Sequence, residues 1–157
     1  MELKADQEKI IKQLITQEEM LSKLYGHFSE QFPEYSKFWN QLSKEEHRHA
    51  RLIQKLFDAA NRGKIFFDEG KITTYTLNAF ISRLEQILHK AMKNEYDIKT
   101  ALGCAMDYEN SLIEKNIFTH FDSSSDNVKR TLNILHSETI THRESIRKVQ
   151  QTIAGNG

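Results

Sequence analysis

The stretch KEEHRHA, residues 44–50, decides how this 157-residue chain is interpreted. It lies in a segment, residues 34–61, whose apolar residues recur every three or four positions, as in an amphipathic helix. Glu45 or Glu46, followed by His49, falls on the apolar side of this pattern, where a core residue is expected. A carboxylate buried without a partner is strongly unfavourable, so these side chains need a partner inside the protein.

Three more segments have the same pattern and also carry polar residues on the apolar stripe. Helices are predicted at residues 6–32, 97–121 and 126–153. The first places Glu18 where a leucine would be expected, and the second places Glu109 there. The last places Glu138 or Thr139, and then His142, on its stripe. The chain therefore reads as two similar halves, each with a single Glu followed by a Glu and a His.

The composition predicts an all-α fold in a single domain, residues 1–157. Helix-forming residues dominate and Pro33 is the one proline. Short connections predict two antiparallel helix pairs, and the long one between them predicts a crossover along a four-helix bundle. We expect residues 64–76 to make this crossing as extended chain. An additional helix is expected at about 77–93, packed on the bundle or forming a dimer surface.

Charge and cysteine content exclude several classes of protein. Lys plus Arg and Asp plus Glu number 22 each and are interspersed, which argues against a nucleic-acid-binding face. No apolar run is long enough to span a membrane, and no signal peptide is evident, so a soluble, cytoplasmic protein is expected. Cys104 is the one cysteine, so this chain cannot form a four-cysteine iron site by itself.

The polar residues on the four stripes have the composition of a two-metal site. Residues three or four apart share a helix face, so Glu46 with His49, and Glu138 with His142, can each approach one ion. In this interpretation Glu46 and Glu138 bridge two ions, and Glu18 and Glu109 are terminal ligands. Four carboxylates balance two divalent ions, which removes the cost of burial. Carboxylate and imidazole ligands suit iron or manganese, and zinc is an alternative.

Three questions stay open on the residues alone. Glu45 competes with Glu46, because it stands at the same distance from His49 as Glu138 does from His142. Each Glu could also be solvated and each His a core residue, which would leave a metal-free bundle. Tyr25 and Tyr108 could donate hydrogen bonds to the carboxylates or pack in the core.

The chain resembles the ferritin-like superfamily, most closely its rubrerythrin-type branch. Glu18 with Tyr25 two turns later is similar to the first helix of that family, and residues 45–50 are similar to its Glu-x-x-His-Ala signature. Tyr108-Glu109 is similar to its third helix. Three features depart from the family pattern. Glu138 precedes His142 by four residues with threonine at 139 and 141, Leu112 replaces a second carboxylate, and the rubredoxin-like domain is absent.

The resemblance implies a di-iron carboxylate protein that acts in iron oxidation or in the reduction of O₂ or peroxide. Its implied ligands are Glu18, Glu46, His49, Glu109, Glu138 and His142. A reductase of this kind would need a separate electron donor, and a homodimer is expected. An iron-binding or storage protein, or a metal-free helical interaction module, are the alternatives.

Overall fold

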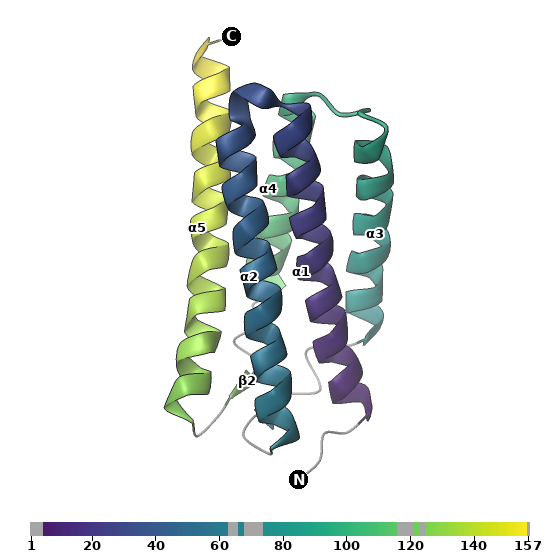
Figure 1. Cartoon of the computed structure of the whole chain (residues 1–157), viewed down its shortest axis with the longest axis vertical. Coiled ribbons are helices and arrows are strands. Elements are labelled where there is room, and N and C mark those ends of the chain that lie inside the picture. The colour runs from purple at the N-terminus through teal and green to yellow at the C-terminus, as the bar shows by residue number, and fades with distance from the viewer. Residues whose placement is uncertain (1–4, 63–65, 68–73, 116–120, 123–124, 157) are drawn as a thin grey trace.

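The computed structural model describes residues 5–62, 66–67, 74–115, 121–122 and 125–156 (Figure 1). Its helices are α1 (Ala5–Gln31), α2 (Ser36–Asn61), α3 (Thr74–Met92), α4 (Ile98–Lys115) and α5 (Asp126–Asn156). A short 3₁₀ helix, η1 (Pro33–Tyr35), joins α1 to α2. Two short strands, β1 (Phe66–Phe67) and β2 (Phe121–Asp122), pair antiparallel.

The predicted all-α, ferritin-like bundle is confirmed. Helices α1, α2, α4 and α5 run along one long axis, with α1 beside α2 and α3 on the outer side of α1 (Figure 1). The additional helix therefore packs on the bundle, and its Leu77, Leu84 and Ile87 are buried. Among the described residues, no helix is both long enough and apolar enough to cross a membrane.

The prediction that residues 64–76 cross the length of the bundle as extended chain is wrong. Helix α3 begins at Thr74 and itself returns the chain along the bundle, so that α4 starts at the same end as α2 (Figure 1). The helix predicted at about 77–93 is confirmed and begins three residues earlier, at Thr74. Of the predicted extended segment, Phe66 and Phe67 are in a strand, whereas residues 64, 65 and 68–73 lie outside the described part.

Helix boundaries otherwise follow local chemistry. Pro33 lacks a backbone N–H and ends α1 before the 3₁₀ turn. Asp97 caps α4, because its carboxylate accepts a hydrogen bond from the backbone N–H of Thr100 at 2.7 Å. The prediction that this helix continues to Phe121 is wrong, since α4 ends at Lys115 and Phe121 is in β2.

A pair of serines joins α1 to α2 one turn from two of the predicted ligands. The hydroxyl of Ser22 donates to the carbonyl of Ser43 at 2.8 Å, and the hydroxyl of Ser43 donates to the carbonyl of Ser22 at 2.7 Å. The helices also approach closely at Gly26, where a Cβ atom would lie 3.3 Å from Ser43 Oγ. These contacts set the register that brings Glu18 and Glu46 to the same level.

An aromatic cluster closes the bundle beyond this serine pair. Trp39 is fully buried, and its ring centroid lies 4.9 Å from that of Phe28 and 5.6 Å from that of Tyr25. Tyr25 also reaches the polar centre of the bundle, so the cluster holds one wall of that centre in place.

Replacement of Trp39 by alanine should therefore lower the free energy of unfolding by about 3–5 kcal/mol. Trp39→Phe should cost much less, because the indole N–H has no hydrogen-bond partner to lose. Urea denaturation followed by circular dichroism measures both. The neighbouring Asn40→Ala, at an exposed position, is the control and should change stability by less than about 0.5 kcal/mol. Equal losses for all three variants would contradict this description of the core.

Candidate metal centre

Five of the six predicted ligands meet in the interior of the bundle. Glu18 comes from α1, Glu46 and His49 from α2, Glu109 from α4, and His142 from α5; each is at most 2% exposed. Each of these side chains takes a position on its helix that an apolar residue would otherwise fill. Buried residues lie one turn before and after Glu18, Glu46, His49 and His142, and Glu109 follows the buried Ala105 by one turn. The predicted convergence of acidic and imidazole groups from four helices is thus present.

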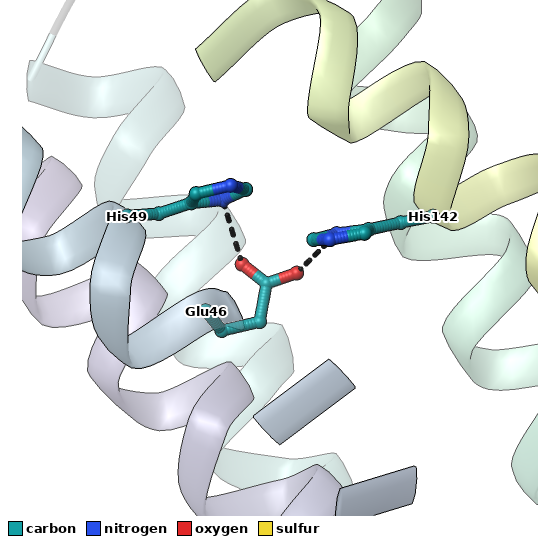
Figure 2. Close-up of side chains that lie close together, drawn as sticks. All are labelled: Glu46, His49 and His142. Atoms are coloured by element: carbon teal, nitrogen blue, oxygen red, sulfur yellow. Dashed lines mark ion pairs between the residues drawn. The ribbon is translucent and has the colours of Figure 1, made fainter. Parts of the chain in front are cut away.

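Glu46 stands between the two histidines, as Figure 2 shows. Its Oε1 atom lies 2.8 Å from Nδ1 of His142, and its Oε2 atom lies 3.4 Å from Nδ1 of His49. The imidazole rings are stacked, with centroids 5.1 Å apart and planes inclined by 19°. One ligand atom from each of these three residues can be chosen so that all lie within 4.8 Å of one another.

Each histidine has a second carboxylate on the same inner side. Glu18 Oε2 lies 3.9 Å from Nδ1 of His49, and Glu109 Oε1 lies 3.7 Å from Nδ1 of His142. Each Nδ1 atom therefore faces one carboxylate of its own together with the shared Glu46. This is an arrangement of two equivalent sets of donors about a common carboxylate.

The outer nitrogen of each histidine contacts a carboxylate from the opposite helix. Nε2 of His49 lies 2.6 Å from Oε2 of Glu138, and Nε2 of His142 contacts Oε2 of Glu45. Glu138 is also paired with Arg48, and Glu45 accepts a hydrogen bond from Gln41 at 2.7 Å. In the neutral form, an N–H at Nε2 leaves each imidazole with a lone pair at Nδ1, directed into the cluster.

The predicted pairing of Glu138 with His142 is therefore wrong, since the structure pairs Glu138 with His49. Each residue of a helix turns by about 100°, so the buried stripe of α5 passes through Leu135, Thr139 and His142. Glu138 lies beside that stripe, with its side chain 27% exposed. Of the two competing residues on α2, Glu46 lies in the inner cluster and Glu45 on the outer side.

Without a metal, protons must compensate for the buried carboxylates. Burial and then the charge of Glu46 raise the pKa of Glu18 well above its ordinary value, and the same causes raise the pKa of Glu109 to about 7. Burial alone would raise the pKa of Glu46, but Glu18 and the histidines lower it well below the usual value. Burial alone would lower the pKa of His142, but Glu109 and Glu46 raise it to about 11. Glu46 is thus the ionised carboxylate of the cluster, and the groups around it carry protons.

The cluster nonetheless leaves polar atoms without hydrogen bonds. Among the described residues, Glu18 Oε2, Glu46 Oε1 and Nδ1 of His142 are buried and have no hydrogen-bond partner. The last two lie 2.8 Å apart, but their geometry is not that of a hydrogen bond. Buried polar atoms that are close together yet unpaired suit a shared cation, so these oxygen and nitrogen donors fit a metal site.

The two tyrosines named from the sequence behave differently. The hydroxyl of Tyr25 donates a hydrogen bond to Oε1 of Glu109 at 3.1 Å, and burial followed by the charge of Glu109 raises the pKa of this phenol. The hydroxyl of Tyr108 instead donates to the backbone carbonyl of Phe80 at 3.2 Å. Tyr25 is therefore a neighbour of the cluster, whereas Tyr108 links α4 to α3.

Reasoning from the sequence missed the outer residues. Neither the contact of Glu45 with His142 nor that of Arg48 with Glu138 was anticipated, although all four residues belong to the two histidine-containing stretches. The one signal was the equal spacing of Glu45–His49 and Glu138–His142. In the structure Glu45 and Glu138 are the two carboxylates that contact the outer nitrogens of the histidines.

Metal binding should release protons, and the affinity should rise with pH. Below pH about 7 an ion must displace the proton of Glu109, and His142 retains a proton up to about pH 11. The apparent affinity should therefore increase by about tenfold per pH unit for each proton displaced, with a shallower dependence above pH 7. Calorimetric titration with Zn²⁺ in buffers of different ionisation enthalpy counts the protons. An affinity that is constant from pH 6 to 8 would contradict the assignment of these pKa values.

Removal of one outer carboxylate should weaken metal binding without removing a donor from the inner cluster. Glu138→Gln retains the shape of the side chain but loses the charge that orients His49, and the expected loss is about 10–100-fold in affinity. Glu19→Gln is the matched control, because Glu19 is exposed on α1 next to Glu18 and should leave the affinity unchanged. Equal affinities for both variants would show that Glu138 has no influence on the centre.

Comparison with known proteins agrees with this geometry. The family model named Rubrerythrin matches residues 9–127, which is more than two thirds of the chain. The matched range contains Glu18, Glu46, His49 and Glu109, and it ends just inside α5, before Glu138 and His142. No curated protein and no solved structure gives a significant match. The chain belongs to the rubrerythrin family.

Proposed function

We propose that this chain is a di-metal carboxylate protein that binds two ions, iron in the first place, in the cluster at the centre of the bundle. One observation carries the proposal: a single buried carboxylate, Glu46, lies between the Nδ1 atoms of two stacked histidines. Each of these histidines has a further carboxylate on the same side. The family match supports a two-metal centre of this type.

The donors divide naturally between two ions. Glu18 and His49 would hold one ion, Glu109 and His142 would hold the other, and Glu46 would be shared. The cost of burying three carboxylates is then offset by metal charge instead of protons. Manganese or zinc could occupy the same oxygen and nitrogen donors.

The reaction we propose is oxidation of iron(II) coupled to the reduction of O₂ or peroxide. A pair of iron ions supplies the two electrons that cleavage of an O–O bond requires. Cys104 is the only cysteine of the chain, so repeated turnover as a reductase would depend on a separate electron donor.

The side chains around the cluster have defined tasks in this proposal. Glu45 and Glu138 orient the two imidazoles through their Nε2 atoms. The Tyr25 hydroxyl donates to Glu109, so it fixes one carboxylate oxygen and holds a proton at the edge of the cluster. The apolar residues of the core, including Leu21, Leu102 and Ile146, exclude water from the bundle interior.

The metal content tests this function directly. Anaerobic loading with Fe²⁺, removal of free iron and elemental analysis should give about two iron ions per chain. Glu46→Ala should bring this number close to zero, because both ions lose a ligand, and Glu109→Ala should lower it at least to one. The thermal midpoint should rise on loading, since an ion that binds only the folded state stabilises it.

The control variant is Glu19→Ala, which should load like the unaltered protein. Addition of O₂ or peroxide to the loaded protein should then oxidise the iron faster than in buffer alone. Absence of bound iron, manganese and zinc would refute the proposal and favour a metal-free bundle. A large hollow oligomer on mass measurement, with iron far above two per chain, would favour storage instead.

A further inference from the structure

The carboxylates on the two nitrogens of each histidine form two matching sets. Glu18 faces His49 as Glu109 faces His142, at 3.9 and 3.7 Å. Glu138 contacts Nε2 of His49 as Glu45 contacts Nε2 of His142. A quasi-twofold axis therefore relates the surroundings of His49 to those of His142. The same axis relates the residue three positions before His49 to the residue three positions before His142.

Those two residues are Glu46 and Thr139, and they differ in chemistry. In four-helix proteins with two-metal carboxylate centres, both histidine-containing helices carry the Glu-x-x-His motif. Here α2 has this motif, whereas α5 has Thr-x-x-His. Thr139 is buried, at 5% exposure, on the stripe that leads to His142. Its hydroxyl donates to the carbonyl of Leu135 at 2.8 Å, so it is engaged within its own helix.

No other acidic side chain of the described residues replaces the missing carboxylate. Glu138 is next to Thr139 in the chain, but it is held between Arg48 and the outer nitrogen of His49. Glu45 is held on the outer nitrogen of His142 and is 26% exposed. The inner cluster therefore has three carboxylates where a complete set would have four.

We propose that Thr139 leaves one bridging position open, and that a small exogenous carboxylate or an anion of similar size occupies it when two ions are bound. This inference rests on the proposed two-metal function. It adds that the centre binds an external ligand opposite Glu46, at a position where threonine is shorter than the glutamate that would otherwise fill it. Open positions at metal centres are the places where external ligands bind.

Titration with Co²⁺, with and without acetate, tests the inference through affinity and the visible absorption spectrum. In the unaltered protein, acetate should tighten binding of the second Co²⁺ by about tenfold or more and should change the spectrum. Thr139→Glu should bind both ions without acetate as tightly as the unaltered protein does with acetate, and acetate should then have no effect. Thr152→Glu is the matched control, because Thr152 is exposed on the same helix and likewise donates to the carbonyl four residues earlier; it should behave as the unaltered protein.

The outcomes separate the two proposals. Two bound Co²⁺ in the unaltered protein with no effect of acetate, or the same acetate effect in Thr139→Glu, would overturn the open position while leaving the two-metal function in place. Binding of two ions by Thr139→Glu alone would support the open position, because it would identify the missing ligand. Absence of binding in both proteins would overturn both proposals.

A second variant applies if Thr139→Glu does not fold. Thr139→Ala enlarges the open position, so it should accept the larger anion propionate at least as well as acetate. The unaltered protein should prefer acetate. The same order of preference in both proteins would overturn the inference.

Discussion

The placement of one ionised carboxylate, Glu46, between two imidazoles is the constraint on which the centre of this bundle depends. A buried charge is tolerated only when opposite charge or hydrogen bonds surround it, and here the surroundings come from all four long helices. In the metal-free protein the compensation is made by protons on Glu18, Glu109 and His142. The apolar core above and below holds the helices at the distance at which these groups meet. The aromatic cluster around Trp39 and the serine pair between α1 and α2 are the packing contacts next to the centre.

The chemistry of the centre follows from the two faces of each histidine. The inner nitrogen faces carboxylates that lie deep in the core, whereas the outer nitrogen faces a partly exposed carboxylate. An imidazole held in this way has its ring plane defined in advance, and the contact at Nε2 favours the neutral tautomer with its lone pair at Nδ1. An ion bound there would exchange with these protons, so the buried acidic groups are compensated in either state. The two histidine-containing helices differ three residues before each histidine, where α2 has Glu46 and α5 has Thr139.

The sequence predicted much of this because helical periodicity is a strong signal. The positions of Glu18, Glu46, His49, Glu109 and His142 on apolar stripes were sufficient to predict that they meet. Glu138 shows where the method fails, because a shift of one residue turns a side chain by about 100° and moves it from the inner cluster to the outer nitrogen of a neighbour. Periodicity alone cannot distinguish residues 138 and 139 when both stand near the edge of a stripe. The prediction of an extended crossing at residues 64–76 is wrong for another reason, since β-rich composition does not show that a helix begins at Thr74 and makes the return itself.

The exchange of outer carboxylates between α2 and α5 also bears on how the chain folds. The contacts of the centre join residues that are far apart in the sequence, with separations of 84 for Tyr25 and Glu109, 89 for His49 and Glu138, and 97 for Glu45 and His142. Each hairpin, α1 with α2 and α4 with α5, contains only half of these partners, and closing long loops before other contacts exist is slow. We therefore expect the centre to form late, when the two helical hairpins dock. In that order of events its acidic groups would stay accessible to solvent, and so to ions, until the hairpins meet.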